Sequence, residues 1–446
     1  MATSTLVPRL LARSIRQTCR QTYLPRTATR AASSIHPKGF TPPTNDELFE
    51  LREQVSDFTR REIPPSVAHA TDLNNDFPTP MWGKLGSAGF LGVTADEEYG
   101  GLGMGYQAHC VVMEELSRAS GSIGLSYAAH SQLCVNQLML HGTPEQKAAF
   151  LPELISGELV GALAMTEAQA GSDVLSMRTK ATKVKGGWEL SGAKLWITNG
   201  PDAHLVIVYA KTDPGARKIT AFIVDTSAPG FSVTRKLDKL GMRGSNTGEL
   251  AFDSVFVPDD RVLGEINGGT KVLMKGLDLE RLVLSAGPLG LMRGAFDVAL
   301  PYVHSRTQFG DPIGHFQLVQ GKLADMYTAY QRSAALTYAL AAAVDTGSAA
   351  HFARPESLFP PPADVTPAHD ARVRSQDCAA AILGAAESAT RVAMDAVQLL
   401  GGMGYSSEMA VGRIMRDAKL YEIGAGTSEV RRVIIGRALN RLYVDV

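Results

Sequence analysis

A carboxylate, Glu280, is set among leucines on one helix face of the segment 273–284, and its setting suits proton abstraction. On a helix, residues three and four apart share a face, which would align Glu280 with Leu277 and Leu284. Apolar surroundings disfavour the charged form of a carboxylate and raise its pKa toward neutrality. Such a group can act as a general base at the pH of a cell. The simpler alternative is a surface helix on which Glu280 extends to water.

The two charged neighbours of Glu280 are not expected to neutralise it. Asp278 and Arg281 are three residues apart on another helix face, where they can pair with each other. Glu280 is then left without a local partner, and carboxylates perturbed in this way often mark functional sites.

Two further segments, 163–173 (LAMTEAQAGSD) and 194–200 (KLWITNG), combine hydroxyl groups and bare backbone with apolar or aromatic side chains. That combination suits a flat polar ring system, which needs a stacking surface and hydrogen bonds along its edge. Gly171, Ser172 and Asp173 could equally form an ordinary turn with a capping residue. No strand, glycine-rich turn and helix follow in βαβ order, so a Rossmann cofactor site is not expected.

The elements that must position these residues fall into three successive regions. Residues 45–160 are mainly helical, and residues 161–265 contain the short β-branched and aromatic runs of an antiparallel sheet. Helical periodicity returns over 270–446, where alanine-rich segments suit the packed helices of a bundle. Helices are expected over 48–63, 107–116, 322–345 and 377–400, and strands over 188–190, 205–210, 219–224, 231–233 and 249–257.

Length and composition indicate a soluble globular protein. The 446 residues exceed one ordinary domain at roughly 150 residues each. Apolar residues make up 45%, charged residues 20%, and the net charge is −1, so no bulk charge would recruit nucleic acid or a membrane surface. No stretch is apolar over the ~18 residues that a membrane span needs.

Residues 1–35 differ from the rest of the chain. Arginines recur there among many Ser, Thr and Ala, no acid precedes Asp46, and Leu6, Leu10 and Ile15 fall on one helical side. This is the amphipathic, acid-poor pattern of a mitochondrial transit peptide. We expect its removal near residues 25–38 and a location in the mitochondrial matrix, the alternative being a disordered basic arm.

Cysteine and proline usage adds two negative indications. The cysteines show no paired spacing and no histidine spacing suited to zinc, so neither a disulfide framework nor a metal site is expected. The proline-rich segment 349–372 cannot be helical and is interpreted as an exposed loop, with a simple spacer as the preferred role. The cysteines are Cys19, Cys110, Cys134 and Cys378.

An ordered set of motifs identifies a resemblance. The two segments described above are followed by 306–310 (RTQFG), 316–317 (FQ), 398–404 (QLLGGMG) and 421–429 (YEIGAGTSE). Together they resemble the acyl-CoA dehydrogenase family over essentially all of residues 45–446. The resemblance implies an N-terminal helical domain, a middle β domain, a C-terminal four-helix bundle, a homotetramer, and FAD held between the β domain and the bundle.

The resemblance also implies roles for individual residues. One group would contact the flavin from the β domain, with Ser172 also at the acyl-CoA, and a second group would reach the remainder of FAD across a subunit interface. Electrons would pass to electron-transfer flavoprotein. The first group is Leu163, Met165, Thr166, Ser172, Trp196, Ile197 and Thr198; the second is Arg306, Gln317, Gln398, Leu399, Leu400, Gly401 and Gly402, and Thr427, Ser428 and Glu429 complete the site.

One departure from the family pattern concerns the base. Most members carry a catalytic Glu directly before the Gly-Thr pair of the last motif, whereas this chain has Ala425 before Gly426. The branches that moved the base place it on the helix that opens the C-terminal domain, where this chain has Glu280. Glu422, three residues before Ala425, is the rival.

The same resemblance indicates a short, branched acyl-CoA substrate. Leu125 and Gly424 match positions that leave room for the branch, and the backbone near Ala425 and Gly426 would face the thioester. Lys271 stands where a tyrosine is expected on the thioester side. Asp278 and Arg281 match positions that contact the CoA moiety, and Leu279 between them is expected to contact the substrate.

Two other functions remain open from the sequence. A long-chain acyl-CoA dehydrogenase also uses a base on this helix, and substrate length would distinguish it. Some family members are non-catalytic flavoproteins that assist assembly of a respiratory complex, but Glu280 and both flavin motifs are complete here.

Overall fold

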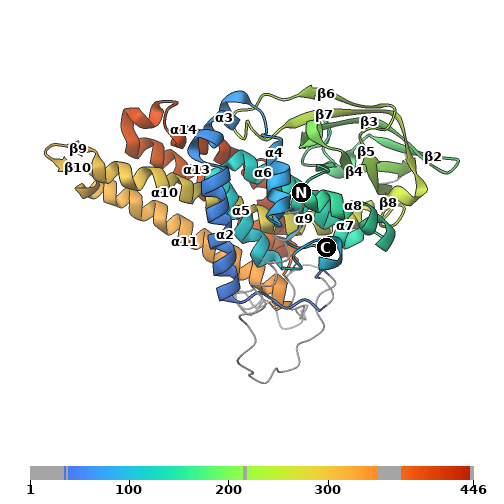
Figure 1. Cartoon of the computed structure of the whole chain (residues 1–446), viewed down its shortest axis with the longest axis horizontal. Helices are drawn as coiled ribbons and strands as arrows, with labels where there is room; N and C mark the ends of the chain where they lie inside the picture. Colours follow the sequence, from blue (N-terminus) through green and yellow to red (C-terminus); the bar gives the residue numbers. More distant parts are fainter. Residues whose placement is uncertain (1–34, 37–38, 214–217, 349–372, 442–446) are drawn as a thin grey trace, which may run out of the picture.

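The computed structural model describes residues 35–36, 39–213, 218–348 and 373–441. The expected transit peptide and its expected removal site lie outside the described residues, apart from residues 35–36, and so does the proline-rich segment 349–372. The described chain forms a helical N-terminal part, a sheet and a long helical bundle, which are arranged along one axis with the sheet and the bundle at opposite ends (Figure 1).

The N-terminal part is helical, as expected. Capping boxes at Thr44 and Thr143 satisfy the first amides of two of its helices and fix where they begin. Residues 75–79 separate the second of these helices from the third. The helices are α2 (Asn45–Glu62), α3 (Pro65–Asn74), α4 (Pro80–Ser87), α5 (Tyr106–Ala119), α6 (Gly121–His130), α7 (Asn136–His141) and α8 (Pro144–Ser156), with a π-helical turn, Ser131–Val135, between α6 and α7.

The sheet has the strand order β6-β7-β3-β2-β4-β5-β8, and β1 pairs with β4. Its pairings are antiparallel, as expected, except that β1 and β2 each run parallel to β4. The sequence did not indicate β1 and β2, because β1 is made of small residues and β2 is lysine-rich and mostly exposed. The strands are β1 (Gly161–Ala164), β2 (Lys180–Val184), β3 (Gly187–Thr198), β4 (Leu205–Asp213), β5 (Lys218–Asp225), β6 (Phe231–Lys236), β7 (Thr247–Pro258) and β8 (Val262–Leu263).

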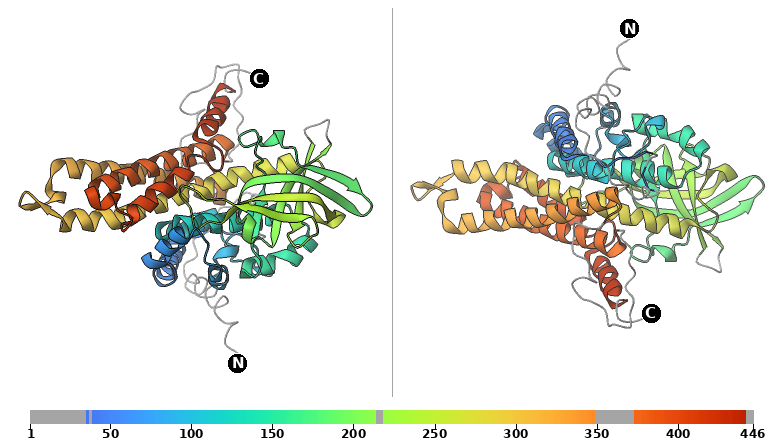
Figure 2. Two further views of the ribbon diagram at one scale, coloured as in Figure 1. Left: turned by 90° about the horizontal axis from the view of Figure 1, so that it is seen from above. Right: turned by 90° about the horizontal axis from the view of Figure 1, so that it is seen from below.

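The C-terminal part is a bundle in which α10, α11 and α13 pack along one another. A short hairpin of β9 and β10 joins α10 to α11 at the far end of the molecule (Figure 1). The N-terminal helices and α15 lie on opposite sides of the long axis (Figure 2). The elements are α9 (Gly269–Leu284), α10 (Ala286–Ser305), β9 (Thr307–Gln308), β10 (Asp311–Pro312), α11 (Gln317–Thr346), α13 (Ser375–Leu400), α14 (Ala410–Leu420) and α15 (Ser428–Asn440).

Helix α9 connects two hydrophobic cores. Leu273 and Leu277, in its first half, pack in the core that includes one face of the sheet. Leu282 and Leu284, near its end, pack in the core shared by the N-terminal helices and the bundle. Residue 280 therefore lies where the helix passes from one core to the other.

The run Gly269–Ser305, formed by α9 and α10, is long and apolar enough to cross a membrane by length and composition. Within the described chain, however, 78% of its most apolar window is buried inside the fold. Burial of this kind is that of a core helix, whose apolar residues face protein rather than lipid.

Candidate active site

Glu280 is buried, and the alternative in which it reaches water is excluded. Its exposed fraction is 4%, and its Oε2 atom accepts no hydrogen bond from any residue that the structure describes. Burial raises the pKa of Glu280 to about 7, against the positive charges of Arg281 and Arg431, which lower it. Burial raises the pKa of Tyr209 on β4, and the negative charge of Glu280 raises it further, so this tyrosine lies within electrostatic range of the carboxylate.

Asp278 and Arg281 form the expected pair. Arg281 Nη1 donates to Asp278 Oδ1 at 2.9 Å, and the hydroxyl of Ser375 on α13 donates to the same oxygen at 2.5 Å. Arg281 is buried. It pairs with Asp278, and its positive charge also lowers the pKa of Glu280. Leu279, on the neighbouring face, is packed into the bundle core.

The loop between α14 and α15 carries an unusual backbone. Ala425 has φ of 55° and Gly426 has φ of 87°, so two consecutive residues occupy the left-handed region. For a residue other than glycine this conformation costs about 1–3 kcal/mol and persists where surrounding contacts fix it. The Gly424 carbonyl accepts a hydrogen bond of 2.7 Å from Arg431 Nη2, and the Thr427 hydroxyl accepts from the Val430 amide at 3.2 Å to cap α15.

Space is available beside this loop. A Cβ atom added at Gly424 would approach nothing in the described chain closer than 3.6 Å, and the atoms it meets all belong to Leu420. Leu125, the other residue expected to shape the acyl pocket, is half-buried on α6 and packs against the same core as Ala425. The site can therefore admit extra width near position 424.

The first two motifs are joined by a buried ion pair. Lys194 Nζ donates to the Met165 carbonyl at 3.0 Å and to Glu167 Oε1 at 2.9 Å, and the Leu195 amide donates to the Thr166 carbonyl at 2.9 Å. Lys194 is fully buried and Glu167 nearly so. The loop that follows β1 is thus fixed against strand β3.

The charges of this pair tune one another. Burial favours a higher pKa for Glu167, but Lys194, the Thr179 hydroxyl and the Arg178 amide outweigh it and hold that pKa at about 2. Burial lowers the pKa of Lys194 to about 8, with Glu167 opposing the change. Both groups are therefore ionised at neutral pH.

The surface beside this pair is suited to a flat ring. Trp196 has φ of 65° at an irregularity in the β3–β7 register and is 58% exposed, whereas Ile197 is buried in the sheet. The hydroxyls of Thr166, Ser172 and Thr198 make no hydrogen bonds within the described ranges, and Ser172 is exposed. An exposed indole with unengaged hydroxyls nearby provides a stacking surface and edge partners.

Three family models match the chain in order. They are the acyl-CoA dehydrogenase N-terminal domain over residues 45–158, the middle domain over 162–255 and the C-terminal domain over 267–440. The chain belongs to the acyl-CoA dehydrogenase family. The resemblance found in the sequence and the fold class expected from it are confirmed.

Several relatives of this acyl-CoA dehydrogenase are similar over most of their length. The mitochondrial isovaleryl-CoA dehydrogenase of Oryza sativa subsp. japonica is 54% identical over 399 residues, which cover 89% of this chain and 91% of the relative. The enzyme of that name from Pongo abelii is 52% identical over 89% of each chain. A mitochondrial 2-methylacyl-CoA dehydrogenase of Solanum tuberosum is 51% identical over 89% of this chain and 91% of its own.

Solved structures share the fold. Butyryl-CoA dehydrogenase from Megasphaera elsdenii has a TM-score of 0.82 at 34% identity and covers 89% of this chain and 99% of its own. A chain from work on the electron transferring flavoprotein of Acidaminococcus fermentans has a TM-score of 0.82 at 33% identity, covering 89% and 98%. Family membership implies a flavin cofactor, and the indole and hydroxyls around β3 fit a flavin ring.

The remaining cofactor residues expected of an acyl-CoA dehydrogenase lie at the far end of the bundle. Lys322 and Asp395 form an ion pair of 2.6 Å that joins the start of α11 to the end of α13. Gln317 and Gln398 are exposed near this pair, and Arg306 is exposed at the end of α10. One chain does not bring this second group together with Trp196, which is what a site shared between subunits requires.

The rival base and the last motif lie close to the loop at Ala425. Glu422 is half-buried and its carboxylate is paired with Lys419 at 2.8 Å. Glu429 is exposed on α15, and Ser428 is buried at the start of that helix. Lys271, the unexpected residue of α9, is exposed.

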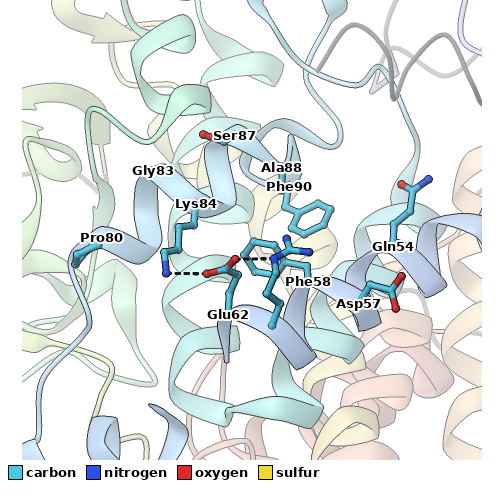
Figure 3. Close-up of a pocket in the computed structure, with 11 residues that line it drawn as sticks. Gln54, Asp57, Phe58, Glu62, Pro80, Gly83, Lys84, Ser87, Ala88 and Phe90 are labelled. Carbon is cyan, nitrogen blue, oxygen red and sulfur yellow. Dashed lines mark hydrogen bonds and ion pairs between the residues drawn. The ribbon is translucent and has the colours of Figure 1, made fainter. Parts of the chain in front are cut away.

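A separate hollow of about 660 Å³ lies on the N-terminal helices between α2 and α4 (Figure 3). Glu62 at its edge pairs with Lys84 at 2.7 Å and with Arg61 at 2.8 Å. Of the described residues that line it, none is a predicted site residue. Also within the described ranges, no group of three or more His, Cys, Asp or Glu side chains could hold a metal ion.

The sequence reasoning missed four residues of this region. Lys194 and Glu167 lie inside the motifs that were singled out, and a charged residue within an apolar motif is the signal that could have found them. Tyr209 on β4 and Arg431 on α15 are far from Glu280 in sequence, so only the fold shows that they surround it.

We predict that breaking the Lys194–Glu167 pair loosens the loop that follows β1, residues 165–173, and weakens flavin binding. Replacing Lys194→Met leaves Glu167 charged and buried, which costs about 3–5 kcal/mol, and releases the Met165 carbonyl. The variant should lose flavin on gel filtration and unfold at lower denaturant concentration. Flavin absorbance per chain and a denaturation curve measure the two effects.

The control for that prediction is Lys180→Met, which changes an exposed lysine of β2. The double variant Lys194→Met with Glu167→Gln should recover part of the lost stability, because it removes the uncompensated charge. Equal flavin retention in Lys194→Met and Lys180→Met would contradict the proposed role of the pair.

Proposed function

We propose that this acyl-CoA dehydrogenase converts isovaleryl-CoA to 3-methylcrotonyl-CoA in the breakdown of leucine, with FAD as its cofactor. The observation that carries the proposal is the buried, unpaired carboxylate of Glu280, combined with Ala425 at the position where most of the family places its base. Relatives of 50–54% identity named isovaleryl-CoA dehydrogenase support the same reaction.

Glu280 removes the α-proton of the thioester. That proton is too weakly acidic for a carboxylate in water, so the developing negative charge on the thioester oxygen must be stabilised. The Ala425 amide is the donor that the chain supplies for this purpose. Burial raises the pKa of Glu280 to about 7, which makes it a stronger base than a solvated carboxylate. The flavin, when bound, supplies the acceptor for the β-hydrogen.

The residues of the loop after β1 and of the end of β3 hold the flavin ring. Thr166, Ser172 and Thr198 supply hydroxyls to its edge, and Trp196 supplies the adjoining aromatic surface. Arg306, Gln317 and the 398–402 turn reach the FAD of a neighbouring subunit, because they lie at the opposite end of their own chain. This division of the site requires at least two subunits, and the homotetramer that the family resemblance implies would provide them.

The substrate end is formed by α9 and the loop at Ala425. Asp278, Leu279 and Arg281 lie along the thioester side, and Leu125 with Gly424 admits the branch of the acyl chain. Gly424 has room for an added carbon in ordinary contact with Leu420, which supports a short chain that is wide near the reacting carbons. The names of the relatives support a mitochondrial location, and the matrix and electron-transfer flavoprotein are the compartment and acceptor that fit this reaction.

A second substrate is favoured by one comparison. The relative named 2-methylacyl-CoA dehydrogenase is 51% identical, close to the values of the others, so the position of the methyl branch is the point to test. A long-chain substrate and a non-catalytic role as an assembly factor are the remaining alternatives from the sequence.

We predict that isovaleryl-CoA bleaches the bound flavin fastest under anaerobic conditions. The comparison set is a 2-methylacyl-CoA, isobutyryl-CoA, butyryl-CoA and palmitoyl-CoA, followed by stopped-flow absorbance. Fastest reduction by palmitoyl-CoA would establish the long-chain alternative, and fastest reduction by the 2-methylacyl thioester would move the branch to the α-carbon. If none of these thioesters reduced the flavin of stable, flavin-loaded protein, the proposed dehydrogenase activity would be excluded.

We predict that Glu280→Gln lowers the rate of flavin reduction by ~10²-fold or more, the contribution typical of a general base. The change is nearly isosteric, so flavin and acyl-CoA should still bind. Adding Ala425→Glu should restore part of the rate, because most relatives place their carboxylate there.

Glu422→Gln is the control for the base assignment. Its carboxylate is already paired with Lys419, so this variant should react at close to the parent rate. Near-parent reduction in Glu280→Gln, together with a loss in Glu422→Gln, would transfer the role to Glu422.

We predict that the rate of flavin reduction rises with pH through about 7 and then levels, because Glu280 must be ionised to accept the proton. Stability should change in the opposite sense. A folded-state pKa above the ordinary 4.5 favours folding below pH 4.5, and this contribution is lost as pH rises through 7. Single-turnover rates between pH 5.5 and 9 test the first statement, and a rate that is already level over this range, as for a solvated carboxylate with a pKa of about 4.5, would contradict it.

A further inference from the structure

Arg431 is an arginine buried without a full set of partners. Its side chain is completely inaccessible, and it is among the largest fully buried side chains of the described chain. Nη2 donates to the Gly424 carbonyl at 2.7 Å, whereas Nε and Nη1 make no hydrogen bond with any described residue. Burying a guanidinium in this way is costly, and helix packing alone does not require it.

The bond to Gly424 determines the direction of the next amide. The Gly424 carbonyl and the Ala425 N–H belong to one peptide unit, which is planar and trans, so they point in opposite directions. A guanidinium that holds the carbonyl therefore aims the Ala425 N–H away from Arg431. It also polarises that peptide and strengthens the N–H as a donor.

The loop needs such a constraint. Ala425 and Gly426 are both left-handed, and the backbone on either side is held by Gly424 N to Leu420 O at 2.8 Å and Ser428 N to Glu422 O at 2.9 Å. These two bonds fix the ends of the loop. The orientation of the 424–425 peptide plane between them is then set by the hydrogen bond from Arg431.

The positive charge of Arg431 also acts on Glu280, the proposed base. Its positive charge lowers the pKa of Glu280, as does that of Arg281, against the effect of burial. Burial and Arg281 lower the pKa of Arg431 itself to about 10, so it stays protonated at neutral pH. The carboxylates of Glu280, Glu387 on α13 and Glu422 act on Arg431 in the opposite direction and raise its pKa. Tyr209 on β4 stays neutral near Glu280, because burial first and the Glu280 charge second raise its pKa.

We propose that Arg431 is a positioning residue for the reaction: it fixes the Gly424–Ala425 peptide so that the Ala425 N–H faces the thioester oxygen, and it provides a second buried cation beside Glu280. This inference rests on the proposed function for the identity of the reacting groups. Arg431 touches neither substrate nor flavin in this role and acts through the loop and the base.

The test compares Arg431→Met and Arg431→Lys in the flavin-loaded enzyme. Arg431→Met removes both the hydrogen bond and the charge, so the reduction rate should fall by roughly 10-fold or more, less than the 10²–10³-fold of deleting an oxyanion donor outright. KM should change less than kcat. The rising limb of the pH profile should move to higher pH, because the carboxylate of Glu280 loses a favourable charge.

Arg431→Lys separates the two contributions. It keeps a cation but lacks the planar fork of the guanidinium, so the rate should fall while the pH limb stays near that of the parent. This variant also keeps the test decisive if Arg431→Met fails to fold.

The matched control is Arg432→Met on the same helix. Arg432 is exposed and its guanidinium pairs with Glu387 at 2.6 and 2.8 Å, so its loss should leave both rate and pH limb unchanged. An unshifted pH limb in Arg431→Met, with rate and stability reduced together, would show a structural role only and overturn the proposal. Parent enzyme that no acyl-CoA thioester reduces would instead refute the proposed function.

Discussion

The structure depends on keeping one carboxylate dry at the point where two hydrophobic cores meet. Helix α9 carries Leu273 and Leu277 into the core beneath the sheet and Leu284 into the core of the bundle, with Glu280 between them. An ion without partners would cost several kcal/mol there, so such a group either changes its pKa or acquires compensating charge. Glu280 does both, with a pKa of about 7 and two arginines nearby. The burial that makes the charged form of Glu280 costly is also what suits it to the proposed role of base.

The three parts of the chain are arranged around this requirement. The N-terminal helices and the bundle pack against one side of α9, and the sheet packs against the other side through β5, with Tyr209 of β4 in the same hydrophobic core. The loop that follows β1 is held by Lys194 and Glu167, separately from the contacts around Glu280. These two residues are as deeply buried as Glu280 but are fully paired. The Lys194–Glu167 pair has all its partners and therefore makes the loop after β1 rigid. Glu280 lacks such partners and can still exchange a proton near neutral pH, which suits the proposed catalytic role.

Sequence periodicity predicted most of the long elements because their apolar faces are long enough to be read locally. The helices over 48–63, 107–116, 322–345 and 377–400 and the five strand segments are present, as is the Asp278–Arg281 pair. The apolar setting of Glu280 could also be predicted from the sequence, because leucines that help to bury it lie on its own helix. Strands β1 and β2 were missed, since their pairing with β4 rather than their composition defines them. Tyr209 and Arg431 were missed for a related reason: a single residue far away in sequence leaves no periodic signal.

The loop at Ala425 explains how a base can change its place while the fold remains. Its left-handed residues are held by backbone bonds and by the contact of Arg431 with the Gly424 carbonyl, and none of these contacts uses the side chain at 425. The peptide can therefore present its N–H to the same point whether residue 425 is alanine or carries a carboxylate. Once that donor is fixed independently, the proton acceptor can come from any element that reaches the same carbon. Helix α9 carries a carboxylate that its own leucines already desolvate, so in the proposed mechanism Glu280 can serve as the base while the Ala425 amide remains the oxyanion donor.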